Sequence, residues 1–158
     1  MTDKTKPMPD ARKLSLSVQY ASRAKDLPTR AQLRRWARIA LADDAHITLR
    51  IVDEVEGREL NKSYRGKDYP TNVLTFVYDD MPPSGLFGDV VLCAPVVERE
   101  AREQRQELSA HYAHLVIHAM LHLQGYEHEE DQEANDMEQL ETALMAKLGY
   151  ADPYAVNR

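Results

Sequence analysis

Apolar and polar positions along the chain form patterns that predict four short β-strands. Two of the segments alternate apolar and polar residues with a period of two, which is typical of strands with one exposed face. The other two are short apolar runs bounded by turn residues such as Pro70. The predicted strands are residues 14–20, 46–52, 72–78 and 87–94.

Five further segments predict helices, because apolar residues recur every three or four positions between suitable capping residues. Thr29 and Gln32 have the spacing of a capping box, Pro95 suits a first helical turn, and Ser109 is the expected cap of the fourth helix. Gly125 is expected to end that helix in a left-handed conformation. The predicted helices are one that begins at Thr29 and residues 54–65, 96–106, 109–124 and 129–148.

The order of these elements predicts one α+β domain with a small mixed four-stranded sheet packed against about five helices. We assign the domain to residues 13–158 and expect residues 1–12, which are polar and contain two prolines, to be a disordered tail. No segment has the roughly 20 apolar residues of a membrane span, so we expect no membrane partner. Cys93 is the only cysteine and can form no internal disulfide, which agrees with a cytoplasmic protein.

The formal net charge is −6 at pH 7, but the charges are unevenly distributed. Residues 1–67 contain 15 Lys and Arg against 9 Asp and Glu, whereas residues 68–158 contain 5 against 17. This asymmetry can place a basic face for nucleic acid on an acidic molecule, and the alternative is that most of these charges only solvate helix surfaces. The cationic residues of the first helix would attract phosphates, whereas the acidic residues 127–141 should repel RNA.

Three histidines near the fourth helix have the spacing of metal ligands. His118 and His122 are four residues apart on one helix, so both imidazoles face the same way and can reach one ion. Gly125 lets the helix end, and three residues later His128 can return to the same ion. We therefore expect a metal site at the end of a central helix, with one zinc ion or another divalent transition metal. Three protein ligands leave a fourth position for a catalytic water.

The spacing H-x-x-x-H-x-x-G-x-x-H is similar to the metal-binding frame of the metzincin zinc proteases. Those proteases have a glutamate as general base directly after the first histidine, and here that position is Ala119. Peptide hydrolysis by their mechanism is therefore not expected. His111 and His114 lie on the same helical stripe, and the sequence leaves them open as alternative ligands, as contacts beside a ligand, or as surface residues.

A second group of polar residues lies in the turn before the third predicted strand. Arg65 and Lys67 flank Gly66 there, with Lys62 before them and Asn72 after them. Arginine can bind a phosphate through two hydrogen bonds, so these four side chains are candidate contacts to a phosphate-containing substrate. A solvated turn explains the same residues. The pair at residues 88–89 is interpreted as a turn with a cap rather than as a catalytic carboxylate.

Taken together, these segments resemble the YbeY family of bacterial endoribonucleases, which are ribosomal RNA maturation factors. The resemblance depends on L-N-x-x-Y-R-G-K-D-x-P-T-N-V-L-T-F at residues 60–76, F-G-D-V-V at residues 87–91, and the histidine segment at residues 114–128. Two positions depart from the usual H-G-x-L-H-L-x-G-Y-D-H pattern. Ala119 replaces a glycine and Glu127 replaces an aspartate, and neither change removes a ligand.

The resemblance implies a metal-dependent, single-strand-specific endoribonuclease that acts in 16S rRNA 3′-end maturation and ribosome quality control. It implies metal ligation by His118, His122 and His128, and a functional role for Arg65 beside the metal-bound water. Single-stranded rRNA is the expected partner, together with ribosomal subunit proteins and other assembly factors. The general base stays open among a hydroxide on the metal, Glu127 and a substrate 2′-hydroxyl. Two alternatives also stay open: a hydrolase of another substrate, and an assembly factor that binds RNA or protein through a largely structural metal.

Overall fold

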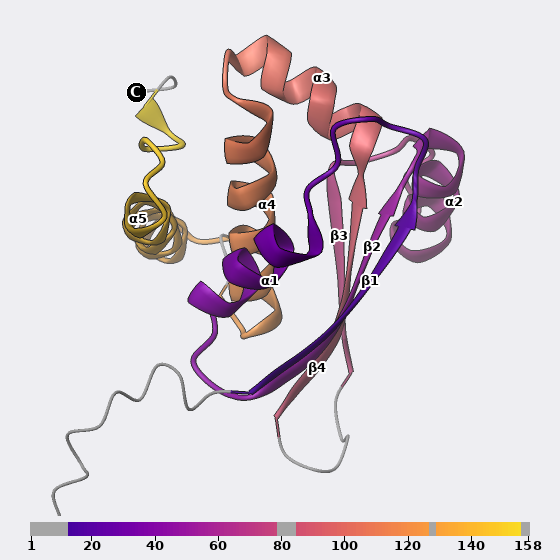
Figure 1. Ribbon diagram of the computed structural model, residues 1–158. Coiled ribbons are helices and arrows are strands. Elements are labelled where there is room, and N and C mark those ends of the chain that lie inside the picture. The colour runs from indigo at the N-terminus through magenta and orange to yellow at the C-terminus, as the bar shows by residue number, and fades with distance from the viewer. Residues whose placement is uncertain (1–12, 79–84, 127–128, 156–158) are drawn as a thin grey trace, which may run out of the picture.

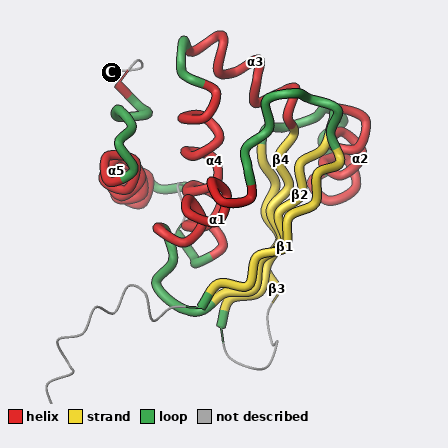
Figure 2. The backbone as a smooth tube through the Cα atoms, viewed as in Figure 1, coloured by secondary structure: helices red, strands yellow, loops and turns green. Residues whose placement is uncertain are grey.

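The computed structural model describes residues 13–78, 85–126 and 129–155, so the predicted tail lies outside the described residues. Strands and helices follow one another in the predicted order (Figures 1 and 2). The elements are β1 (Leu14–Ala21), α1 (Arg30–Ile39), β2 (Ala45–Val52), α2 (Glu54–Arg65), β3 (Val73–Tyr78), β4 (Leu86–Cys93), α3 (Ala94–Gln104), α4 (Leu108–Leu123) and α5 (Asp131–Lys147).

The four strands form one mixed sheet with the order β1-β2-β4-β3. β1 pairs with β2 and β2 with β4 in parallel, whereas β3 is antiparallel to β4. The prediction of a small mixed sheet in one α+β domain is therefore confirmed. Because β3 is at the edge of the sheet, its outer side is available to line a binding site.

Helices pack on both faces of the sheet (Figure 1). α1 and α4 lie on one face and contact each other, while α2 lies on the opposite face. α5 packs against α4 on the side away from the sheet. α4 is therefore the central helix of the domain, enclosed between the sheet, α1 and α5.

The sequence of α4 explains this central position. It is apolar on most of its circumference, as in LSAHYAHLVIHAMLHL, and such a helix is stable only when it is buried on most sides. Ten of its sixteen residues are buried, including Tyr112, Ile117 and Met120, which have no exposed surface. Neither α4 nor any other helix in the described ranges is long and apolar enough to cross a membrane.

Several predicted element ends are confirmed and two local predictions are wrong. The Thr29 capping box is present, and Pro95 lies in the first turn of α3. Ser109 is not the cap of α4: the helix begins one residue earlier, with Glu107 as N-cap, because the His111 N–H donates to the Glu107 carbonyl at 3.0 Å. The turn predicted at residues 88–89 is also wrong, because both residues lie inside β4.

Gly88 explains that second error. A Cβ atom at this position would lie 2.9 Å from the Phe76 carbonyl oxygen and 3.0 Å from Cδ2 of Leu123. The glycine is therefore required by the close approach of β3 and α4 to β4, not by a turn. This approach fixes the distance between β3 and the last turn of α4, which are two sides of the site described below.

Candidate active site

Three histidines interrupt the buried surface of α4. From His111 to Leu123 every residue is buried except His114, His118 and His122, which are half-buried. Residues four apart lie on the same helix face, so the three imidazoles form one stripe along α4. Polar, titratable side chains thus occupy the one accessible stripe of an otherwise apolar helix.

The rings of His118 and His122 are held by hydrogen bonds at Nδ1. Nδ1 of His118 lies 2.6 Å from Oε2 of Glu141, and Nδ1 of His122 lies 3.1 Å from the carbonyl oxygen of Tyr126. A carbonyl and an ionised carboxylate can only accept, so each Nδ1 is assigned the proton and donates it. In this tautomer the ring lone pair is on Nε2, which is the arrangement of a metal-ligating histidine. The two rings are nearly parallel, at 4°, with centroids 6.3 Å apart.

Glu141 of α5 connects two of these histidines and has no exposed surface. Its Oε2 accepts from His118 and its Oε1 lies 2.7 Å from Nε2 of His114, while the Tyr154 hydroxyl donates to the same Oε1. Burial alone would raise the pKa of this carboxyl group, but the hydrogen bonds from His114 and His118 outweigh burial and lower its pKa to about 2. Glu141 is therefore an ionised acceptor that fixes both rings.

A pocket of about 430 Å³ lies in front of the histidine stripe. β3 contributes one wall through residues 73–76, α4 contributes His118 and His122, and the C-terminal end of α2 contributes Tyr64 and Arg65. Segments that are far apart in the sequence thus meet at the open edge of the sheet. The pocket contains the predicted functional arginine and two of the three predicted metal ligands.

The end of α2 places Arg65 in this pocket. Gly66 ends the helix in the left-handed conformation, with φ 72°, and its N–H donates to the carbonyl groups of Asn61 and Lys62. Arg65 is the last helical residue, and its side chain is exposed. The guanidinium group can therefore approach a substrate phosphate without first leaving a buried ion pair.

The other predicted substrate contacts lie in different places. Lys62 lines a separate pocket beside Asp68, and Lys67 is exposed in the turn after α2. The amide nitrogen of Asn72 donates to Glu100 at 3.0 Å, and Asn72 does not line the pocket that contains Arg65. Roles in substrate binding for these three residues remain predictions.

The two histidines whose roles the sequence leaves open have different surroundings. His114 shares the Glu141 carboxylate with His118, so it lies directly beside a predicted ligand. His111 is buried, and its Nε2 lies 2.8 Å from Oε1 of Glu100, which also accepts from Asn72. His111 therefore belongs to a separate buried cluster between α3, α4 and the start of β3.

The donor chemistry of the pocket fits a zinc ion. Two imidazoles whose Nδ1 atoms are anchored can offer Nε2 to one metal from successive turns of a helix. Within the described ranges no group of three or more His, Cys, Asp or Glu side chains is placed to hold a metal. The third predicted ligand, His128, lies outside the described residues, as does Glu127. Zinc and its complete ligand set thus remain a prediction that the two described histidines fit.

Sequence reasoning missed Glu141, although a signal for it exists. Glu141 belongs to the acidic residues 127–141 that the sequence predicts to repel RNA, but the buried residues of α5 are Met137, Glu141, Leu144 and Met145. These positions have the three- and four-residue spacing of one helix face. A carboxylate in the middle of an apolar stripe needs a buried partner, and that requirement could have pointed to the histidines.

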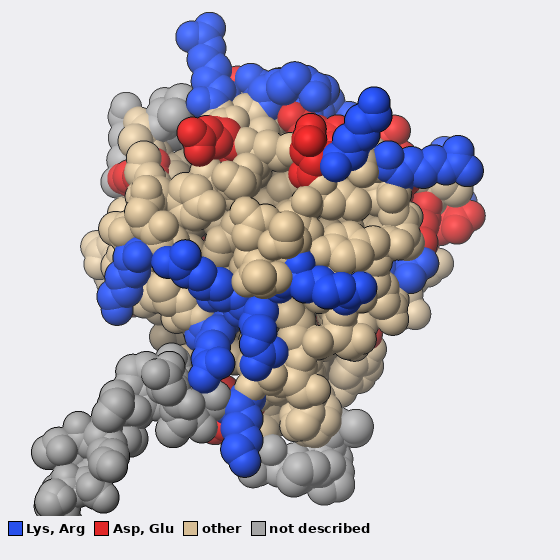
Figure 3. All heavy atoms as spheres, viewed as in Figure 1, with Lys and Arg blue, Asp and Glu red and all other residues tan. Residues whose placement is uncertain are grey.

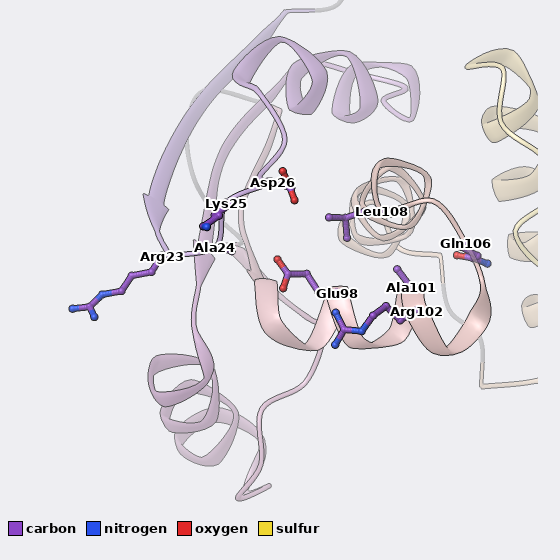
Figure 4. Close-up of a pocket in the computed structure, with 9 residues that line it drawn as sticks. All are labelled: Arg23, Ala24, Lys25, Asp26, Glu98, Ala101, Arg102, Gln106 and Leu108. Carbon is purple, nitrogen blue, oxygen red and sulfur yellow. The ribbon is translucent and has the colours of Figure 1, made fainter.

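A different pocket, of about 390 Å³, lies between α3 and the connection from β1 to α1 (Figure 4). Arg23, Lys25 and Arg102 line it together with Asp26 and Glu98. This lining has charges of both signs, contains no histidine, and includes no residue predicted to be functional. We therefore place the candidate active site at the histidine stripe and not here.

A family model described as Endoribonuclease YbeY matches residues 17–149 of the chain. The chain belongs to the YbeY family of endoribonucleases. A relative named Endoribonuclease YbeY from Nitrosospira multiformis is 56% identical, over an alignment that covers 93% of this chain and 85% of the relative. Another relative of the same name, from Aromatoleum aromaticum, is 58% identical, and the alignment covers 90% of this chain and 94% of that relative. The family resemblance proposed from the sequence is confirmed.

A solved structure supports the fold of this YbeY family member. The solution structure of TM1509 from Thermotoga maritima superimposes with a TM-score of 0.57 at 28% sequence identity. The superposition covers 84% of this chain and 88% of TM1509. The similarity therefore extends over most of the domain.

Proposed function

We propose that this YbeY family member is a metal-dependent endoribonuclease that cleaves single-stranded RNA. The observation that carries the proposal is the pocket that combines Arg65 from α2 with His118 and His122 from α4. Phosphodiester cleavage is accelerated by a cation at the phosphate and by a Lewis acid near the scissile bond, and these residue types supply the first and can hold the second. The names of the relatives support RNA as the substrate.

Each described residue has a defined task in this proposal. His118, His122 and the predicted third ligand His128 would hold zinc, whose Lewis acidity would polarise a phosphoryl oxygen and make water more acidic. Arg65 binds the phosphate and offsets the negative charge that develops in the phosphorane-like transition state. Glu141 holds the His118 ring so that Nε2, and not Nδ1, faces the pocket.

Positive charge on α1 supports attraction of an RNA partner. The helix contains Arg30, Arg34, Arg35 and Arg38 and no acidic residue in its first turn. Figure 3 shows Lys and Arg side chains gathered across the face that carries α1, although the whole chain has a net charge of −6. Counterion release from bound RNA favours binding to such a surface. We propose 16S rRNA 3′-end maturation and ribosome quality control in the cytoplasm as the setting, with ribosomal proteins and assembly factors as partners.

The proposal is tested by elemental analysis of the purified protein beside cleavage of a single-stranded RNA, with and without chelator. We expect about one zinc per chain and cleavage that is lost on complete metal removal and restored by zinc. The Arg65→Ala variant should keep its metal and its fold and lose cleavage. Arg102→Ala, an exposed arginine of α3 in the pocket of Figure 4, is the matched control and should cleave like the unmodified protein.

The same measurements distinguish the alternatives. Cleavage that persists in rigorously metal-free protein would contradict the proposed mechanism. A protein that binds RNA and requires zinc to fold, but never cleaves, would instead be an assembly factor with a structural metal. Hydrolysis of small phosphoesters or nucleosides without RNA cleavage would indicate a hydrolase of another substrate.

A further inference from the structure

Aromatic side chains are grouped at the rim of the candidate active site, where the proposed cleavage chemistry gives them no role. Tyr64 is 66% exposed and lines the pocket beside Arg65. Phe76 lines the same pocket, and its ring contacts that of Tyr64 edge to face, with centroids 4.9 Å apart and planes at 67°. Tyr78 is 48% exposed and lies two residues after Phe76, on the same face of β3. We call Tyr64, Phe76 and Tyr78 the aromatic row.

Tyr78 is anchored, so the row has a defined geometry. Its hydroxyl donates to Oδ2 of Asp89 across the β3–β4 pair at 2.5 Å. This hydrogen bond is the main reason that the pKa of Tyr78 is raised, followed by burial and the Asp89 charge, and the smallest contribution comes from nearby Tyr64. Tyr78 and Phe76 thus extend the aromatic surface along β3, while Tyr64 adds to it from α2.

The exposure of Tyr64 suits a planar ligand. A single exposed apolar residue is common in soluble proteins and needs no explanation. Here, however, Tyr64 is two-thirds exposed, its ring is supported from one side by Phe76, and it lies next to Arg65, the proposed phosphate contact. Nucleic-acid-binding proteins that accept single strands combine these two features, aromatic faces for the bases and cations for the backbone.

We propose that the aromatic row, with Tyr64 as its main contact, is a stacking site for an unpaired RNA base next to the phosphate bound by Arg65. This inference rests on the proposed function and extends it to the origin of strand selectivity. Inside a duplex both faces of each base are covered by neighbouring pairs, so no internal base can stack on Tyr64 without being unpaired. A base in single-stranded RNA is already unpaired and can stack on Tyr64 directly. Every base has a π-face, and the site should therefore tolerate any sequence.

The test compares four proteins: unmodified, Tyr64→Ala, Tyr64→Phe and Tyr69→Ala. Tyr69 is 53% exposed, follows Tyr64 by five residues and does not line the pocket, which makes it a matched control. Values of kcat and KM are measured for a single-stranded RNA and for the same RNA paired with its complement. We expect Tyr64→Ala to raise KM for the single strand about tenfold with little change in kcat, because stacking on one ring has this order of effect. Cleavage of the duplex should not change.

Tyr64→Phe keeps the ring and should keep the preference for single-stranded over duplex RNA. If the Tyr64 hydroxyl made the important contact instead, Tyr64→Phe would behave like Tyr64→Ala. A set of oligonucleotides with one abasic nucleotide at successive positions gives a second readout. At one position the missing base should raise KM for the unmodified protein but not for Tyr64→Ala, since the two changes remove the same contact. Thermal unfolding confirms that the variants fold.

The outcomes separate this inference from the proposed function. If the unmodified protein cleaves RNA and Tyr64→Ala keeps its preference for single strands, the stacking site is refuted and the proposed function is not. If the abasic penalty is equal in both proteins, the base that matters is bound elsewhere. If the unmodified, metal-loaded protein cleaves no RNA, both the proposed function and this inference are overturned.

Discussion

The carboxylate of Glu141 allows a sharp prediction about metal binding, because one fully buried group orients two imidazoles. In the Glu141→Gln variant the side chain keeps its shape but loses its charge, and one of its two acceptor oxygens becomes an NH₂ donor. That donor must face the ring nitrogen of either His114 or His118, which at present donates to Glu141 at 2.7 or 2.6 Å. At least one ring must therefore change its tautomer or turn away.

The expected magnitude follows from these contacts. Loss of the partner that fixes a ligating histidine typically lowers metal affinity by about 10- to 100-fold. The metal-free protein should also lose roughly 3 kcal/mol of stability, because a buried charge-assisted interaction is broken while both imidazoles remain. A Glu103→Gln variant removes an equal charge from an exposed position on α3 and should change neither quantity measurably.

Zinc affinity is measured by competition with a chromophoric chelator, and the tautomers are read from the ¹⁵N shifts of the histidine rings in the metal-free protein. We expect weaker binding together with a His118 ring that is no longer exclusively protonated at Nδ1. If Glu141→Gln fails to fold, Tyr154→Phe removes one donor to the same carboxylate and should give a smaller change of the same sign. Unchanged affinity and an unchanged His118 tautomer would refute the orienting role.

Three further predictions concern other parts of the molecule. Gly88→Ala should destabilise the protein by about 1–3 kcal/mol, measured by urea unfolding, because the added methyl group would lie within 3.0 Å of neighbouring atoms. The double variant Arg34→Ala, Arg35→Ala should weaken RNA binding at low salt and reduce the slope of log K against log [salt] by about 1–2. Burial opposes ionisation of Glu100, but hydrogen bonds from His111 and Asn72 outweigh burial and lower the pKa of its carboxyl group. The ionised Glu100 carboxylate therefore stabilises the fold above pH 4.5, and this stabilisation is lost as the pH falls through the lower native pKa. The stability difference between unmodified protein and Glu100→Gln should accordingly shrink below pH 4.5.

Each of these predictions has an outcome that contradicts it. A Gly88→Ala protein as stable as the original would mean that β3 and α4 can separate without cost. An unchanged salt slope in the arginine variant would place RNA away from α1. A stability difference for Glu100→Gln that stays constant down to pH 3 would show that its carboxylate is not preferentially ionised in the native state.

Local patterns predicted the elements and the common face of His118 and His122 well, because both depend on residues close together in the sequence. The four-residue spacing of His118 and His122 defines one helix face whatever the rest of the fold does. The errors at the ends of elements have a local cause as well. Glycine is compatible with a turn and with close packing, so its identity alone could not show that Gly88 is required by packing inside β4 and not by a turn.

Contacts between distant segments could not be predicted in the same way. The resemblance to the family grouped Arg65 with the histidines, but the order β1-β2-β4-β3 is what brings the end of α2 and α4 to the same edge of the sheet. Asn72 illustrates the opposite outcome. It lies in the same motif as Arg65, yet its amide is directed to Glu100. Backbone direction at the start of β3, not proximity in the sequence, decides which side chain reaches the pocket.

The burial of α4 has a consequence for the metal site that we propose at its histidines. Ligands borne on flexible loops can move to suit ions with different preferred geometries, but His118 and His122 project from the most enclosed helix of the domain. Amide hydrogens of this helix should exchange with deuterium only when the whole domain unfolds. Because the rings of His118 and His122 cannot turn freely, the fixed directions of their Nε2 lone pairs would favour transition-metal ions whose preferred geometry matches them. The exposed C-terminal end of α2 would instead adapt to different RNA substrates.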